Sequence, residues 1–376
     1  MRGVADDRTV RLVRSLGSDA RGLRAVRAPG RVNLIGDHTD YCEGFVLPLA
    51  IDRECVVVWR PRADGRVVVR SLEADLEADV AADGSDEPRS VEPGWARFVA
   101  GVVRALGGRG RAPFGFTAAL SSTVPVAAGL SSSSALAVAI TLVAADAGKL
   151  DIEAREAARA ALEAEVLATG VPGGLMDQLA SLFGRRDHAL LIDCRDLSIS
   201  PVPLPRTHAV LVVNSGLPRT LAGSVYAQRR ASCEAAATRL GLTTLRDARL
   251  EQVRDDPRAR HVVSENARVI EAATALRAGD VNAVGRLMLE SHVSLRDDYD
   301  VSTPELDLLV DLLVTGGAAG ARLTGAGFGG CVIALVQRNH ADDIAARSVL
   351  TYEKETGHSA SAFVASAVDG AGSLDL

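Results

Sequence analysis

The chain has 376 residues and a formal net charge of −6, and 47% of its residues are hydrophobic, 24% charged and 3% aromatic. This composition is ordinary for a globular protein, and the length exceeds what one hydrophobic core usually holds, so we expect two domains. The acidic balance argues against a nucleic-acid-binding protein, because that function needs a concentrated basic face.

Two further features of the sequence indicate the cellular location of the chain. Its five cysteines are dispersed, without a C-x-x-C motif for a metal or redox centre, as is typical of reduced thiols. The first residues lack the apolar segment of a signal peptide, and the longest apolar stretch, 135–145, is too short to span a bilayer. We expect a cytoplasmic protein without nucleic-acid or membrane partners, a monomer or weak dimer that binds small molecules.

In the first half of the chain, strand-like runs precede helical ones. Apolar periodicity predicts a helix over 4–16 and strands over 23–32, 45–49, 54–60 and 66–71. We expect the turn at 63–65 to join the last two strands as a hairpin, and the acidic stretch 73–93 to be an irregular surface excursion. The elements expected next are a helix over 95–106, a strand over 114–120, a helix after the serines at 131–134, a helix capped by Asp151 that ends near 168, and a short helix over 175–183.

The second half alternates in the same way. Strands are predicted over 189–193 and 208–214, and the proline-rich link Pro201–Pro205 between them is our candidate domain junction. The later elements are helices over 221–240, 259–278, 280–296 and 304–314, strands over 319–324 and 331–336, a helix over 340–355 and a strand near 360–366. This order predicts an α+β protein with lobes at 1–200 and 206–366 and a frayed tail at 367–376.

The stretch from Thr123 to Leu136 reads TVPVAAGLSSSSAL and predicts a loop that closes into a helix with a serine at its N-cap. Backbone amides and hydroxyls at a helix N-terminus form an anion site. The lysine of a Walker motif is absent. The residues by themselves leave two interpretations, an anion site and a well-capped buried helix.

A second polar stretch, from Gly30 to Tyr41, reads GRVNLIGDHTDY. Such polarity can belong to a plain surface loop, but its place between two apolar segments favours a crevice. Two carboxylates and an imidazole suit a polyol ligand, since carboxylates accept hydrogen bonds from neighbouring hydroxyls. A metal at His38 and Asp40 is less favoured, because no second histidine stands at ligand spacing.

A third stretch, Gly325 to Gly330, fits the G-x-G-x-x-G pattern of dinucleotide-binding proteins. That function needs a helix directly after the glycines, whereas a strand is predicted at 331–336. The stretch instead indicates a glycine hairpin that approaches a phosphate site, with a plain hairpin turn as the alternative.

Taken together, the three stretches resemble one family. Residues 30–41 are similar to the galactokinase signature, and residues 124–134 and 323–330 are similar to the second and third motifs of the kinases of galactose, homoserine, mevalonate and phosphomevalonate. The resemblance implies a two-lobed small-molecule kinase with mixed sheets and helices in both lobes, ATP in the N-terminal lobe and the sugar between the lobes.

The resemblance also implies residue roles. Asp177 would act as base or orienter at the reacting hydroxyl, and Arg31 would stabilise charge on the phosphoryl group. The implied sugar contacts are Asp37, His38, Asp40, Gly174 and Tyr226. The implied nucleotide contacts are Gly129, Leu130, Ser131, Ser132, Ser133 and Ser134, with Mg²⁺ held by Ser133 and Glu165. Without the resemblance, Asp177 would be interpreted as an acidic residue that complements the positive end of its helix. Glu165 would be interpreted as an exposed helix residue, and Tyr226 as a core residue.

The implied reaction is ATP- and Mg²⁺-dependent phosphorylation of the anomeric C1 hydroxyl of α-D-galactose to galactose 1-phosphate. The chain departs from the family at Asp37, where galactokinases commonly have a glutamate that contacts the C6 hydroxyl; the side chain is shorter by about 1.5 Å. One alternative is therefore a sugar 1-kinase for arabinose, galacturonate, fucose or N-acetylgalactosamine. A separate alternative, from another class of protein, is a non-catalytic galactose and ATP sensor. Ala326 replaces a usual glycine, which the hairpin tolerates if that position does not need positive φ.

Overall fold

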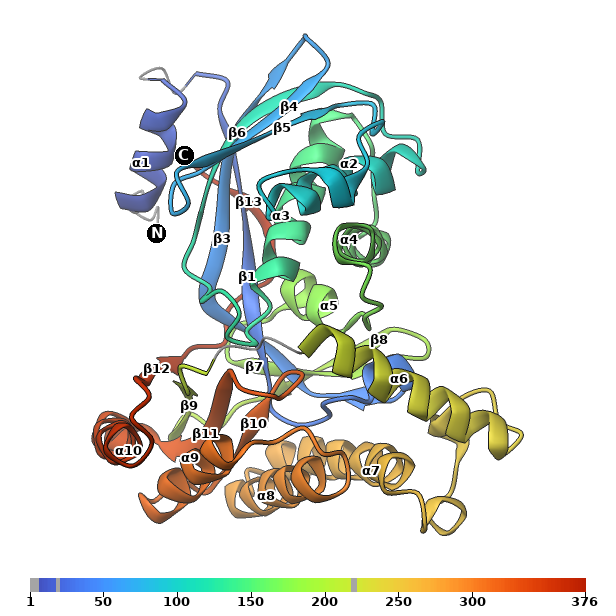
Figure 1. Ribbon diagram of the computed structural model, residues 1–376. Coiled ribbons are helices and arrows are strands. Elements are labelled where there is room, and N and C mark those ends of the chain that lie inside the picture. Colours follow the sequence, from blue (N-terminus) through green and yellow to red (C-terminus); the bar gives the residue numbers. More distant parts are fainter. Residues whose placement is uncertain (1–6, 18–20, 218–221) are drawn as a thin grey trace.

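The structure is a computed structural model that describes residues 7–17, 21–217 and 222–376. Two lobes meet at a waist (Figure 1). The upper lobe in that view contains a six-stranded sheet in the order β13-β1-β3-β6-β4-β5. Its strands are β1 (Arg24–Asn33), β3 (Pro48–Arg62), β4 (Arg66–Ser71), β5 (Leu76–Ala81), β6 (Gly115–Ser122) and β13 (Gly372–Leu374).

Helices cover both faces of this sheet (Figure 1). Helix α1 (Asp7–Ser15) packs on one face through Leu12, which is fully buried. The other face carries α2 (Ala96–Gly107), α3 (Ser132–Ala147), α4 (Ala154–Thr169) and α5 (Met176–Phe183). Because α3 is built almost entirely from apolar residues after its serines, it is buried nearly all round and lies directly against β1 and β3.

The lower lobe contains an antiparallel four-stranded sheet in the order β10-β11-β9-β12. Its strands are β9 (His208–Asn214), β10 (Gly320–Thr324), β11 (Cys331–Gln337) and β12 (Ser361–Ala365). Its helices are α6 (Ala222–Arg239), α7 (Pro257–Ala278), α8 (Val281–Asp297), α9 (Pro304–Thr315) and α10 (Ala341–Thr356). A small sheet of β2 (Phe45–Val46), β7 (His188–Asp193) and β8 (Ser198–Pro203) lies in the waist.

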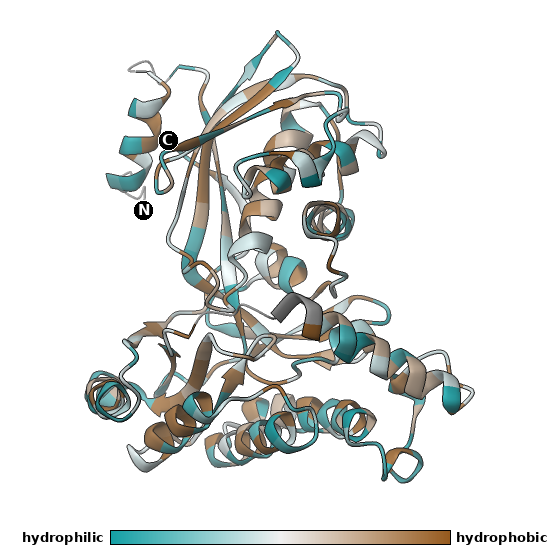
Figure 2. Cartoon of the chain, in the orientation of Figure 1, coloured by the Kyte–Doolittle hydropathy of each residue, from teal (hydrophilic) through white to brown (hydrophobic). Residues whose placement is uncertain are grey.

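One buried apolar cluster runs from the upper sheet into the lower lobe, so the lobes share a core. It joins Val57 and Ile51 of β3 with Val212 of β9 and Ile333 of β11, all of them fully buried. Figure 2 shows the strands of both sheets as mostly hydrophobic. No helix in the described part of the chain is long and apolar enough to cross a membrane.

The predicted hairpin at residues 63–65 is wrong. Strands β3 and β4 follow one another in the chain, but β6 lies between them and pairs antiparallel with β3 and parallel with β4. The true hairpin partner of β4 is β5, which lies inside the stretch predicted to be irregular. Parallel pairing with a distant strand leaves no local signal in the sequence.

Three other expectations need correction at element ends. The proline-rich link at 201–205 is partly strand β8, which is an edge strand and so tolerates prolines that cannot donate to a neighbour. The tail expected to fray contains β13, which pairs with β1 and forms the edge of the sheet. Helix α4 begins at Ala154 with Glu153 at its N-cap, so Asp151 does not cap it.

Candidate active site

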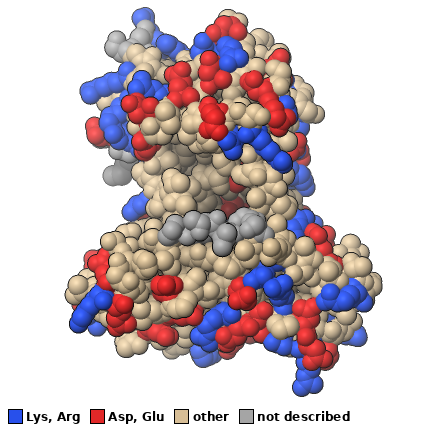
Figure 3. Space-filling view, in the orientation of Figure 1, with Lys and Arg blue, Asp and Glu red and all other residues tan. Residues whose placement is uncertain are grey.

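A cavity of about 860 Å³ lies between the lobes and is lined by every residue expected at the site except Leu130. Figure 3 shows the waist hollowed on this face, with mostly uncharged side chains around it. Leu130 is buried, and its carbonyl accepts a hydrogen bond from the backbone N–H of Arg31 at 3.2 Å. The stretch from Thr123 to Leu136, which we call the Ser-rich loop, is thereby fixed to β1.

Arg31 and Asp177 form the central ion pair of this cavity. Arg31 Nε lies 2.7 Å from Asp177 Oδ1, and Nη2 lies 2.8 Å from Oδ2, so the contact is bidentate. The third nitrogen, Nη1, donates to the Gly129 carbonyl at 2.6 Å. Arg31 is almost fully buried, whereas the Asp177 side chain is 25% exposed to the cavity. The pair therefore joins the end of β1, the first turn of α5 and the Ser-rich loop at one point.

The serine at the start of α3 does not cap its helix as expected. Ser131 occupies the N-cap position in a left-handed conformation, with φ of 61°, and its side chain makes no capping hydrogen bond. Its hydroxyl instead donates to Asp177 Oδ2 at 2.5 Å. The first amides of α3 are thus left without a side-chain cap beside the cavity, which is the arrangement of an anion site.

Ser133 and Glu165 lie together, as the metal hypothesis requires. Ser133 Oγ donates to Glu165 Oε2 at 3.0 Å, and Gln178 Nε2 donates to Oε1 at 2.5 Å. Burial raises the pKa of Glu165 to about 7, against the hydrogen bond from Ser134, and the negative charge of Asp177 adds to the rise. A divalent cation beside these oxygens would relieve that cost, so the donor set fits Mg²⁺.

Three of the five expected sugar ligands, Asp37, His38 and Asp40, lie in the loop from 33 to 45, which we call the acceptor loop. Asp40 lies so close to Gly174 that a Cβ on that glycine would stand 1.8 Å from Asp40 Oδ2. Burial raises the pKa of Asp40 to about 7, and the charge of Asp177 contributes to the rise. His38 accepts a hydrogen bond from the Tyr41 hydroxyl at 2.9 Å, and its ring centroid lies 5.6 Å from that of Tyr226.

The glycine hairpin between β10 and β11 approaches the Ser-rich loop as expected. A Cβ on Gly325 would stand 3.1 Å from the Gly129 carbonyl oxygen. Ala326 is not among the residues with positive φ, so the alanine in place of a glycine causes no backbone strain. Its carbonyl accepts a hydrogen bond from His38 Nε2 at 3.3 Å, which connects the hairpin to the acceptor loop.

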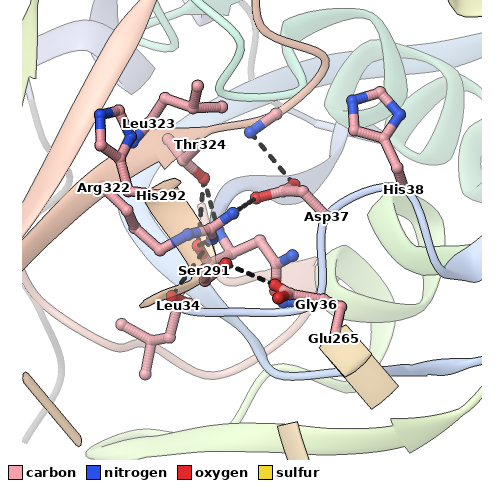
Figure 4. A network of polar contacts seen from close by, with 12 residues as sticks. Leu34, Gly36, Asp37, His38, Glu265, Ser291, His292, Arg322, Leu323 and Thr324 are labelled. Atoms are coloured by element: carbon pink, nitrogen blue, oxygen red, sulfur yellow. Dashed lines mark hydrogen bonds and ion pairs between the residues drawn. The ribbon is translucent and has the colours of Figure 1, made fainter. Parts of the chain in front are cut away.

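Asp37 lies in the cavity wall, but its carboxylate points toward the buried side chain of Arg322 (Figure 4). Oδ2 lies 2.6 Å from Arg322 Nη2, and Oδ1 accepts a hydrogen bond from the Gly325 amide at 3.2 Å. Burial raises the pKa of Asp37, against the opposing charges of Arg322 and Arg31. This carboxylate therefore has partners before any sugar is present.

Sequence reasoning missed the residues that hold the acceptor loop. Glu265 accepts a hydrogen bond from the Gly36 amide at 2.9 Å, Asn266 Oδ1 accepts one from the Phe45 amide at 2.8 Å, and Arg322 lies behind Asp37. The one available signal was a charged residue, Arg322, inside the apolar strand just before the third motif.

Comparisons with known proteins identify the family of the chain. Residues 14–61 match the galactokinase galactose-binding signature, residues 97–185 the N-terminal domain of GHMP kinases and residues 272–352 their C-terminal domain. A galactokinase of Roseiflexus sp. (strain RS-1) is 47% identical over 362 residues, which cover 92% of each chain.

Solved structures of related kinases are similar to this chain. The Lactococcus lactis galactokinase complexed with galactose superposes with a TM-score of 0.90 at 32% identity, covering 96% of this chain and 98% of that one. The Methanococcus jannaschii mevalonate kinase, at 17% identity and a TM-score of 0.69, covers 92% of this chain and 98% of its own. The latter likeness concerns the fold alone.

Proposed function

The chain belongs to the galactokinase family of the GHMP kinases, and we propose that Asp177 and Arg31 perform its reaction at the C1 hydroxyl of α-D-galactose. Membership assigns it galactokinase activity, the ATP-dependent phosphorylation of galactose. The observation that carries the proposal is the bidentate Arg31–Asp177 pair at the junction of the acceptor loop and the Ser-rich loop.

In the proposed step, the C1 oxygen attacks the γ-phosphorus of ATP. The bond to the β–γ bridging oxygen breaks, ADP leaves, and the hydroxyl proton passes to Asp177. Since transfer goes through a loose transition state, Asp177 acts mainly by orienting the hydroxyl and takes the proton late. Arg31 stands beside Asp177 at 2.7 Å and stabilises the negative charge of the transferring group.

The phosphates are proposed to bind the backbone amides of residues 129–134. Support comes from the uncapped start of α3 and from the glycine hairpin, which packs against Gly129 beside the cavity. Ser133 and Glu165 would hold Mg²⁺, which supplies charge neutralisation of the phosphates when bound. The raised pKa of Glu165 supports this assignment, because a buried carboxylate gains most from a cation partner.

The sugar is proposed to lie against His38, Asp40, Gly174 and Tyr226. Asp40 contributes acceptor oxygens, and Gly174 leaves the space that those oxygens occupy. His38 and Tyr226 provide ring surfaces beside them. We also propose a cytoplasmic location, based on five free cysteines that all lie in the described residues, and a monomeric or weakly dimeric state.

The test is ADP release from ATP in the presence of galactose, with the product identified by ³¹P NMR. The wild type should give galactose 1-phosphate, and Asp177→Ala should lose at least about 1,000-fold in kcat. Asp146→Ala is the matched control, because Asp146 is an exposed aspartate paired with Arg24 away from the cavity. Galactose and ATP binding without ADP release in the wild type would instead indicate a sensor and contradict the proposal.

A further inference from the structure

Asp37, whose carboxylate is expected to contact the C6 hydroxyl, already has partners within the protein. Asp37 Oδ2 and Arg322 Nη2 form an ion pair at 2.6 Å, although the approach lies outside hydrogen-bond geometry, and Oδ1 accepts from the Gly325 amide. The two side chains are 2% and 0% exposed. Figure 4 shows the Asp37 carboxylate pointing toward Arg322.

Arg322 is itself fixed, so it cannot follow Asp37 into the cavity. Its Nη1 donates to the carbonyls of Asn33 and Leu34, each at 3.2 Å. Both carbonyls belong to the start of the acceptor loop. The guanidinium therefore holds the backbone of this loop and the Asp37 carboxylate at the same time.

The backbone around Asp37 is held as well. His261 Nε2 donates to the Asp37 carbonyl at 3.2 Å, and Glu265 Oε1 accepts from the Gly36 amide at 2.9 Å. Glu265 and His261 are fully buried. Withdrawing the carboxylate from Arg322 toward a sugar would thus break a buried ion pair without any compensating movement of the chain.

This arrangement changes what a missing C6 hydroxyl costs. A site whose buried polar group depends on a substrate hydroxyl rejects the analogue without it by about 10⁴–10⁵-fold, because that group is left unpaired. Here the Asp37 carboxylate keeps the charge of Arg322 and a hydrogen bond from the Gly325 amide whether or not the hydroxyl is present, although Oδ2 itself makes no hydrogen bond. Loss of the hydroxyl therefore leaves no uncompensated buried charge at this wall of the cavity.

We propose that the Asp37–Arg322 pair is a positioning device that joins the acceptor loop to the glycine hairpin, and that it makes the kinase tolerant at C6. The chain then phosphorylates 6-deoxygalactose at C1 as well as galactose, by the same transfer step. Galacturonate is excluded, since its C6 carboxylate would lie beside the carboxylate of Asp37. This inference rests on the proposed function.

The test compares kcat/KM of the wild-type protein for galactose, 6-deoxygalactose and galacturonate, with ATP and Mg²⁺ present. We expect galactose and 6-deoxygalactose to differ by less than about tenfold and galacturonate to fall at least about 100-fold below both. A larger preference for galactose over 6-deoxygalactose overturns the inference while leaving the proposed function intact. No turnover of galactose itself contradicts the proposed function instead.

Two variants separate positioning from direct contact. Arg322→Lys keeps the charge but loses the planar fork, so KM should rise by the same factor for galactose and 6-deoxygalactose, with kcat little changed. Asp37→Glu lengthens the side chain by about 1.5 Å and should raise the preference for galactose at least about tenfold. Thermal unfolding confirms that each variant is folded. A rise in KM for galactose alone in Arg322→Lys, or an unchanged preference in Asp37→Glu, overturns the inference.

Discussion

The acceptor loop and the Ser-rich loop face each other across the cavity, yet they are held in different ways. Residues 31–39 are buried throughout, and side chains of the lower lobe hold the backbone at Gly36 and Phe45. The Ser-rich loop is fixed to β1 by Arg31 at Gly129, but its Val126 is 84% exposed. Of these two loops, as far as the described residues show, only the acceptor loop contacts buried charged side chains of the lower lobe, namely Glu265 and Arg322.

This difference matches the different tasks of sugar recognition and phosphate binding. The acceptor loop must distinguish one sugar from others, and fixed partners keep its polar groups in place before the sugar arrives. The Ser-rich loop binds phosphates through backbone amides, which every nucleotide triphosphate can use in the same way. Specificity therefore depends on buried ion pairs of the lower lobe, and phosphate binding depends on the start of α3.

The largest effect is expected from Glu265→Gln, which removes the buried charge that holds Gly36. Burial would raise the pKa of Glu265, but the charges of Arg268, His261 and Arg322 keep it at about 2, so the group is ionised. Loss of one partner of a buried pair should lower the free energy of unfolding by about 3–5 kcal/mol and raise KM for galactose but not for ATP.

The control for that change is Glu163→Gln, because Glu163 pairs with Arg109 at the surface and is 48% exposed. Denaturant unfolding should give a difference of less than about 1 kcal/mol for the control. Equal losses in the two variants would mean that the acceptor loop does not depend on its buried charge.

A smaller effect is expected from Gly174→Ala, which places a methyl group against Asp40. Gly174 does not have positive φ, so the backbone accepts alanine, and the three atoms nearest to the added Cβ all belong to Asp40. Galactose KM should rise about 100-fold, as expected for a 1–3 kcal/mol overpacking cost, while ATP KM stays unchanged. Gly173→Ala, whose Cβ would meet only a Leu162 methyl at 3.1 Å, should leave both constants unchanged. Equal effects at the two glycines would contradict a role of Asp40 in galactose binding.

The pH dependence of stability should identify Asp40 as well. Its pKa in the folded state is about 7, against 3.8 for the unfolded chain, so the folded state retains a proton between these pH values. The free energy of unfolding should therefore fall as pH rises from about 4 to about 7 and stay low above it. Asp40→Asn should be stabilised relative to wild type by about 1–3 kcal/mol more at pH 8 than at pH 5. Parallel pH profiles of the two proteins would contradict the raised pKa.

The smallest effect is expected from Val126→Ser in the Ser-rich loop. Because this side chain is 84% exposed, the change should alter the free energy of unfolding by less than about 0.5 kcal/mol and leave galactose KM unchanged. Calorimetry and steady-state kinetics measure both quantities. A loss comparable to that of Glu265→Gln would show that the two loops do not differ as described.

The resemblance to the galactokinase family was sufficient to predict the convergence of Arg31, Asp177 and the serines, whereas the residues alone indicated only first-turn charge complementarity for Asp177. It was not sufficient to predict what holds them. Glu265 and Arg322 contact the acceptor loop from 229 and 289 residues away, and no local period encodes such a contact. The parallel pairing of β4 with β6 and the addition of β13 to β1 failed to be predicted for the same reason. A serine was expected at the N-cap of α3, and Ser131 occupies that position, but its hydroxyl donates to Asp177 instead of to the helix.

In the proposed mechanism the Arg31–Asp177 pair performs the transfer and does not merely bind the sugar. The direct measurement is single-turnover formation of galactose 1-phosphate by Asp177→Asn, alongside its galactose affinity by calorimetry. We expect the rate to fall at least about 1,000-fold while the dissociation constant changes less than about tenfold. A variant that binds galactose normally and still forms the product at the wild-type rate would contradict the claim.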